Sequence, residues 1–137
     1  MTKISSVKYT NAYVNLGMLI LRVAAGWMIF RFHGLMKIEH FSEIAHRFAN
    51  PLHIGSYASF LLVIFAEIIC APLVVLGLFT RWATIPLIIE LLVLIFLVHG
   101  GFGFRDVEVV IFYLAGFVTT LLIGPGKISL DGLISRK

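Results

Sequence analysis

Four long apolar runs, separated by polar or glycine-containing stretches, dominate the chain. They cover about residues 16–35, 57–79, 82–99 and 107–123. Each is close to the ~17–25 residues that a helix needs to cross a bilayer. The runs are continuous rather than alternating, and an exposed sheet edge cannot exist in lipid, so strands are excluded. The pattern predicts an all-α fold: a transmembrane four-helix bundle that forms one domain over residues 1–137.

A weaker pattern lies between the first two runs. Apolar side chains recur there at helical spacing, with histidines and charges on the opposite side: Phe41, Ile44, Phe48 and Leu52 against His40, Glu43, His46 and Arg47. This pattern predicts a short amphipathic helix within residues 38–54. The sequence leaves open whether this helix lies flat at the membrane interface or folds as a cap over the mouth of the bundle.

Composition supports a membrane protein. Of the 137 residues, 60% are hydrophobic and 13% charged, which is more apolar material than one soluble core requires. The net charge of +4 comes mostly from basic residues at the ends of the runs, so the partner is a lipid bilayer and nucleic acid is excluded. Cys70 is the only cysteine, which excludes an internal disulfide and a cysteine-ligated iron–sulfur cluster within the chain.

The distribution of basic residues predicts the orientation. Six of them lie on the side of the termini and four on the other: Lys3, Lys8, Arg81, Lys127, Arg136 and Lys137 against Arg31, Lys37, Arg47 and Arg105. Because loops rich in Lys and Arg stay in the cytoplasm, both termini are expected there.

Ionisable residues inside the apolar runs are the candidate functional groups: Arg22, Glu67 and Glu90 near mid-depth, and His33, His99 and Glu108 near the outer ends. Such groups cost roughly 2.5–3.5 kcal/mol each on insertion scales and therefore face the bundle interior. At ~1.5 Å per residue, Arg22 and Glu90 reach similar depth, with Glu67 slightly further out. An ion pair between Arg22 and one of the two carboxylates is expected, and the spacing does not choose between them.

Two helix faces gather small and polar residues. On the first run, Arg22, Gly26, His33 and Lys37 share one face, since eleven residues bring a helix back to about the same direction. On the fourth run, Glu108, Ala115 and Thr119 form a comparable stripe. Both stripes are expected to face the interior. They serve either to fix helix register, as buried ion pairs often do, or to handle a ligand or protons; both interpretations stay open.

Metal and haem chemistry find little support in the residue pattern. His40, His46 and His53 match no compact metal motif, so no metal site is expected. His33 and His99 are the pair that could ligate a haem between helices, but no wider haem signature accompanies them, and we do not expect one.

Several segments resemble the DoxX family in order along the chain. They are Leu21-Arg22-Val23-Ala24-Ala25-Gly26, His33-Gly34-Leu35 with Lys37, Glu67, Gly77-Leu78-Phe79-Thr80-Arg81, His99, Glu108, and Gly124-Pro125-Gly126-Lys127-Ile128-Ser129-Leu130-Asp131. The resemblance implies a small four-helix protein of the prokaryotic cytoplasmic membrane. The family takes its name from a subunit of thiosulfate:quinone oxidoreductase, and some members belong to membrane-associated oxidoreductase complexes. By position, it singles out Arg22, His33, Lys37, Glu67, His99 and Glu108, whereas Glu90 does not map onto it.

The leading hypothesis is a membrane subunit of an oxidoreductase system that binds a quinone or a similar small hydrophobic molecule in its polar interior. His33 and Lys37 would hydrogen-bond a quinone carbonyl, while His99 and Glu108 exchange protons with the outer aqueous phase. Electrons would come from a partner, because the chain carries no cofactor motif and no independent catalytic motif.

Two alternatives are kept. The first is a non-catalytic anchor for a soluble redox protein, which would dock through the segment 38–54 or the C-terminal tail. The second is transport of protons or a small solute, which would require a homo-oligomer because four helices leave little room for a path within one chain.

Overall fold

The computed structural model describes residues 10–48, 50, 53–98 and 107–135, and all regular structure in them is helical. The first long helix is built from α1 (Asn11–Met28), η1 (Ile29–Gly34) and α2 (Leu35–Glu39), and a short α3 (Phe41–Ile44) follows it. The second comprises α4 (Ser56–Ile64), η2 (Phe65–Cys70) and α5 (Ala71–Leu76). The third comprises α6 (Thr80–Val93) and η3 (Leu94–Val98), and α7 (Val107–Ile123) and α8 (Leu130–Ser135) complete the order.

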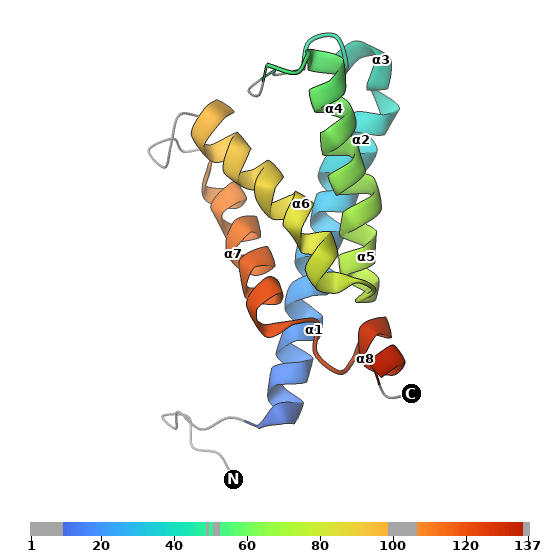
Figure 1. Ribbon diagram of the computed structural model, residues 1–137, viewed down its shortest axis with the longest axis vertical. Coiled ribbons are helices and arrows are strands. Elements are labelled where there is room, and N and C mark those ends of the chain that lie inside the picture. Colours follow the sequence, from blue (N-terminus) through green and yellow to red (C-terminus); the bar gives the residue numbers. More distant parts are fainter. Residues whose placement is uncertain (1–9, 49, 51–52, 99–106, 136–137) are drawn as a thin grey trace.

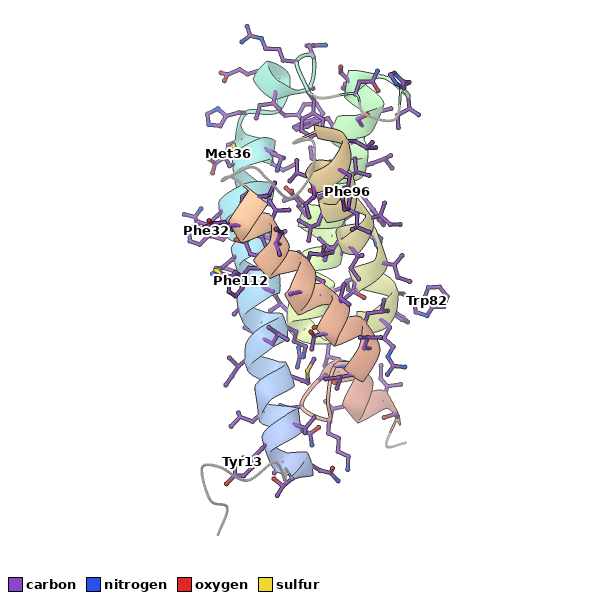
Figure 2. All side chains as sticks on the ribbon, turned by 90° about the vertical axis from the view of Figure 1, so that its left-hand side faces the viewer. Tyr13, Phe32, Met36, Trp82, Phe96 and Phe112 are labelled. Carbon is purple, nitrogen blue, oxygen red and sulfur yellow. The ribbon has the colours of Figure 1, made fainter. Side chains whose placement is uncertain are left out.

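Three of these helices are long and apolar enough to cross a membrane: Asn11–Glu39, Ser56–Leu76 and Thr80–Leu97. The fourth, α7, is apolar but has 17 residues. The outer surface is apolar as well. Trp82 is 77% exposed and Phe112 81%, and Figure 2 shows both side chains directed away from the bundle. A water-soluble monomer rarely exposes such large apolar surfaces, so this exterior suits acyl chains.

Small residues allow the helices to approach closely. α6 packs along α7, and α1 packs against both α5 and α7; Figure 1 shows α5 beside the first helix. A methyl group at Gly26 of α1 would lie 2.8 Å from Val75 Cγ2 and 3.0 Å from the Ala71 carbonyl oxygen. Close backbone approach is how membrane helices gain packing energy when the solvent is itself apolar.

The segment after the first helix differs from the expectation. The helix predicted within residues 38–54 is reduced to the four residues of α3, because the first helix continues to Glu39. The segment folds onto α4 as a cap. The Phe41 ring lies 5.9 Å from that of Tyr57 and 5.2 Å from that of Phe60, and Phe48 lies 5.0 Å from Phe60. These aromatic contacts favour the cap over a helix lying flat on the membrane.

The C-terminal segment turns back against the opposite end of the bundle. α8 lies beneath the end of α5 (Figure 1), and the Asp131 N–H donates a 2.7 Å hydrogen bond to the Gly77 carbonyl. Gly77 takes the left-handed conformation that ends α5, with φ of 74°. The Leu78 N–H bonds the Leu73 carbonyl, as in a Schellman motif.

Each of the three long helices contains a π-helical segment: η1, η2 and η3. Such segments break the regular hydrogen-bonding ladder and occur often at functional sites. η1 carries His33 and contacts η2, which carries Glu67. Two of the three π-helical segments therefore carry a candidate polar residue.

Candidate functional site

A cavity of about 590 Å³ lies between the helices. It is lined by residues of the first, second and third helices and of α7. Its walls are mostly apolar and include Ile29, Leu62, Phe65, Leu94 and Val110. Six lining residues carry polar groups: His33, Lys37, Ser59, Glu67, Glu90 and Tyr113. Volumes of about 300–1,000 Å³ with apolar walls and a few polar groups are typical of small-molecule sites.

An ion pair joins the first and second helices beside this cavity. Lys37 Nζ lies 2.9 Å from Glu67 Oε1 and 2.8 Å from Oε2. The side chains of Lys37 and Glu67 are 14% and 4% exposed, so the pair is largely removed from solvent. Gly34 lets the helices come together here, because a methyl group on it would lie 3.2 Å from the Glu67 Cβ and from its carbonyl oxygen.

Glu90 of α6 brings a second carboxyl to the same place. It interacts electrostatically with Glu67 and Lys37, and its carboxyl lies within hydrogen-bonding reach of that of Glu67. Its Oε2 atom is buried and accepts no hydrogen bond from any described residue. A buried oxygen without a partner is rare in native proteins.

His33 lines the cavity about one helical turn before Lys37 on the first helix. Its ring meets the ring of Tyr113 edge to face, with centroids 5.8 Å apart. Its charged neighbours are Lys37 and Glu67. The cavity therefore collects His33, Lys37, Glu67 and Glu90, contributed by three helices, with Tyr113 from the fourth.

Arg22 is buried elsewhere, and the expected ion pair with Glu67 or Glu90 is wrong. Its guanidinium group, 1% exposed, donates to four backbone carbonyls. Nε lies 3.1 Å from the Pro125 oxygen, and Nη1 lies 3.2 Å and 2.5 Å from those of Val74 and Val75. Nη2 donates to the Ile128 carbonyl.

These carbonyls explain why Arg22 needs no carboxylate in contact. Val74 and Val75 belong to the last turn of α5, where carbonyl groups carry partial negative charge and can accept further hydrogen bonds. The loop after α7 adds two more carbonyls. We call this set of contacts, made by Arg22, the end of α5 and residues 124–131, the tail latch.

Asp131 completes the tail latch and was missed as a candidate. Its carboxylate accepts hydrogen bonds from the Phe79 N–H (2.8 Å), the Thr80 N–H (2.9 Å) and the Thr80 hydroxyl (2.7 Å). It thereby caps the first turn of α6. Burial opposes ionisation, but the bonds from Thr80 and Phe79 and the positive charge of Arg22 outweigh it, so the pKa of Asp131 is lowered.

The polar stripe expected on the fourth helix faces outward, which is a correction. Glu108 and Ala115 are exposed, whereas Tyr113, Gly116, Phe117 and Thr120 face the core. The Thr119 hydroxyl bonds the Ala115 carbonyl of its own helix, so it needs no interior partner. Glu108 lies in the first turn of α7, where the helix dipole favours a carboxylate.

Glu108 lines a different feature, a groove of about 460 Å³ between α1 and α7. His99, the remaining candidate, lies outside the described residues. Among those that are described, no group of three or more His, Cys, Asp or Glu side chains could hold a metal ion.

Comparison with known protein families identifies the family of the chain. The DoxX family model matches residues 17–100, which include Arg22, the ion pair and Glu90. The chain belongs to the DoxX family. It is thus a membrane protein, in keeping with its apolar helices. Neither a curated protein nor a solved structure matches the chain.

Proposed function

We propose that this DoxX protein is a subunit of an oxidoreductase system in the prokaryotic cytoplasmic membrane. In this proposal it is a four-helix bundle forming one domain over residues 1–137, and it binds a quinone or a similar small hydrophobic ring molecule. The observation that supports it is the apolar cavity with a charged, incompletely satisfied end formed by Lys37, Glu67 and Glu90.

Lys37 and His33 supply the polar contacts to a bound ring. An ammonium group has three donors, and Lys37 directs two hydrogen bonds at Glu67, which leaves one N–H for a ligand carbonyl. His33, about one turn earlier on the same helix, lines the cavity and offers a ring nitrogen. The apolar walls would hold the ring and the start of a hydrocarbon tail by ordinary burial.

The protein itself supplies no electrons in this proposal. The redox partner is a separate protein, and this chain positions the ring and excludes water from it. Glu108 has no place in the site, because it does not line the cavity.

The expected orientation places both termini in the cytoplasm. The beginning of α1, the end of α7 and α8 all lie at one end of the bundle (Figure 1), which is the arrangement that an even number of crossings produces. Cysteines introduced at Lys127 and at His46 should react with a membrane-impermeant thiol reagent from opposite sides of the membrane. Labelling of both from one side would contradict the four-crossing arrangement.

Ligand binding tests the proposal directly. The purified protein in lipid nanodiscs should bind a short-tailed quinone or its hydroquinone with saturable affinity, measured by equilibrium dialysis. Lys37→Met should weaken binding by about tenfold or more, the value of a charge-assisted hydrogen bond. Glu108→Gln, which changes a carboxyl outside the cavity, is the matched control. The absence of saturable binding to both forms at large excess would overturn the proposal.

A further inference from the structure

The polar end of the cavity holds more lone pairs than donors. Both oxygens of Glu67 accept from Lys37, whereas Glu90 Oε2 accepts from no described residue. Neither carboxylate can donate, so the Glu67 and Glu90 carboxyls can bond each other only by sharing a proton. One shared proton satisfies one oxygen of Glu90 and leaves lone pairs on its carboxyl.

This excess of acceptors over donors costs free energy. A buried acceptor without a hydrogen bond loses its hydration and gains nothing in return. Glu90 lines the cavity, so a molecule that fills the space can reach its carboxyl. The Glu90 carboxyl therefore needs a hydrogen-bond donor, and the cavity walls around this carboxyl are mostly apolar.

We propose that the occupant donates a hydrogen bond to the Glu90 carboxyl, so that the ligand class is a ring bearing a hydroxyl group. A hydroquinone or another phenol fits: the hydroxyl donates to Glu90, and its oxygen accepts from the remaining N–H of Lys37. A quinone brings only acceptors and leaves Glu90 unpaired. This inference rests on the proposed function and goes further, since it predicts that the site prefers the hydroquinone over the quinone.

Three ligands that differ only in their polar groups test it. A short-tailed 1,4-hydroquinone, its quinone and its dimethyl ether are compared by equilibrium dialysis, without oxygen and with a mild reductant for the hydroquinone. The hydroquinone should bind about tenfold more tightly than the dimethyl ether and than the quinone, as expected for one hydrogen bond.

Two substitutions test whether Glu90 causes the preference for the hydroquinone. Glu90→Leu removes the acceptor and should bring the three affinities to within about twofold. Glu90→Gln retains a carbonyl oxygen and should keep the preference for the hydroquinone. Glu108→Leu, which removes a carboxyl from the groove between α1 and α7, should leave the preference unchanged. If Glu90→Leu fails to fold, the comparison of the three ligands on the unaltered protein still decides.

The outcomes separate this inference from the proposed function. Equal affinities in the unaltered protein, tighter binding of the quinone, or a preference that survives Glu90→Leu would overturn the inference while leaving the cavity a ring-binding site. No binding of any of the three would overturn both.

Discussion

The two ends of the bundle each bury a cation, and they treat it differently. At the tail latch, Arg22 directs its donors at four carbonyls, and residues 125–128 close over it. At the other end, Lys37 pairs with Glu67 beside an open cavity and next to the unpartnered Oε2 of Glu90. A buried charge such as that of Arg22, in which every side-chain nitrogen has a hydrogen-bond partner and the chain covers the group, holds the fold together. One that is partly satisfied and faces free volume is suited to bind something.

This difference predicts how each end responds to substitution. Removing a member of a saturated network leaves buried groups unpaired and costs stability, whatever ligand is present. Removing a member of the cluster formed by Lys37, Glu67 and Glu90 should affect ligand binding more than folding, except where the substitution leaves a buried charge without its partner.

The largest effect is expected at the tail latch. Arg22→Met keeps most of the side-chain volume but removes the side-chain donor of four carbonyls, and we expect a loss of about 3–5 kcal/mol in the free energy of unfolding. Thermal unfolding in nanodiscs measures it. Arg31→Met, an exposed position on the same helix, is the control and should change stability by less than about 0.5 kcal/mol. Equal effects of the two substitutions would contradict the latch.

The next effect is expected at the ion pair. Lys37→Met leaves the Glu67 and Glu90 carboxyls buried without a positive charge beside them. It should therefore lower the free energy of unfolding by about 2–3 kcal/mol. The double variant Lys37→Met/Glu67→Leu should regain most of that loss, because an apolar pair replaces a buried ion pair at little cost. Ligand binding should stay weakened in both. Binding restored in the double variant would show that Lys37 is not a ligand contact.

A smaller effect is expected for the cap on α6. Asp131→Ala removes the acceptor for three hydrogen bonds and should lower the free energy of unfolding by about 1–2 kcal/mol. Limited proteolysis should detect faster cleavage near residues 124–131. Unchanged proteolysis and stability would contradict the role of Asp131 in holding the tail.

The pH dependence of the latch follows from the lowered pKa of Asp131. A carboxyl whose pKa is lower in the folded state stabilises the protein above its unfolded value of 3.8 and ceases to do so as the pH falls through the folded value. The tail should therefore stay protected from proteolysis by pepsin near pH 4 and become cleavable at lower pH. Asp131→Asn should remove that pH dependence, and a transition that persists in this variant would assign it to another group.

The sequence predicted the helices well because each apolar run is long and continuous, and tertiary contacts cannot override so strong a pattern. The contacts of single residues were harder. Arg22 was expected to pair with a carboxylate because a sequence shows which side chains are charged. It does not show that backbone carbonyls at the end of α5 accept hydrogen bonds from Arg22 instead. Lys37 was expected to face the interior on the same stripe as His33, but it was given no ion-pair partner, and the first helix was expected to end at residue 35. The helix continues to Glu39, and the long side chain of Lys37 reaches the Glu67 carboxylate.

Glu108 shows a further limit of reasoning from polarity. It was expected to face inward with Ala115 and Thr119, but the core face of α7 is formed by small, aromatic and threonine side chains such as Gly116, Phe117 and Thr120. A carboxylate in the first helical turn and a threonine bonded to its own helix are both satisfied without the interior. Polarity alone therefore does not decide which face of a short apolar helix is buried.

The contrast between a structural and a binding charge is tested most directly by the stability of Glu90→Leu measured beside Arg22→Met in the same bilayer, without ligand. We expect Arg22→Met to lower the midpoint of thermal unfolding sharply and Glu90→Leu to leave it unchanged or raise it, since leucine replaces an acceptor that has no partner. If Glu90→Leu lowered the midpoint of thermal unfolding as much as Arg22→Met does, Glu90 would serve only to stabilise the fold, as Arg22 does.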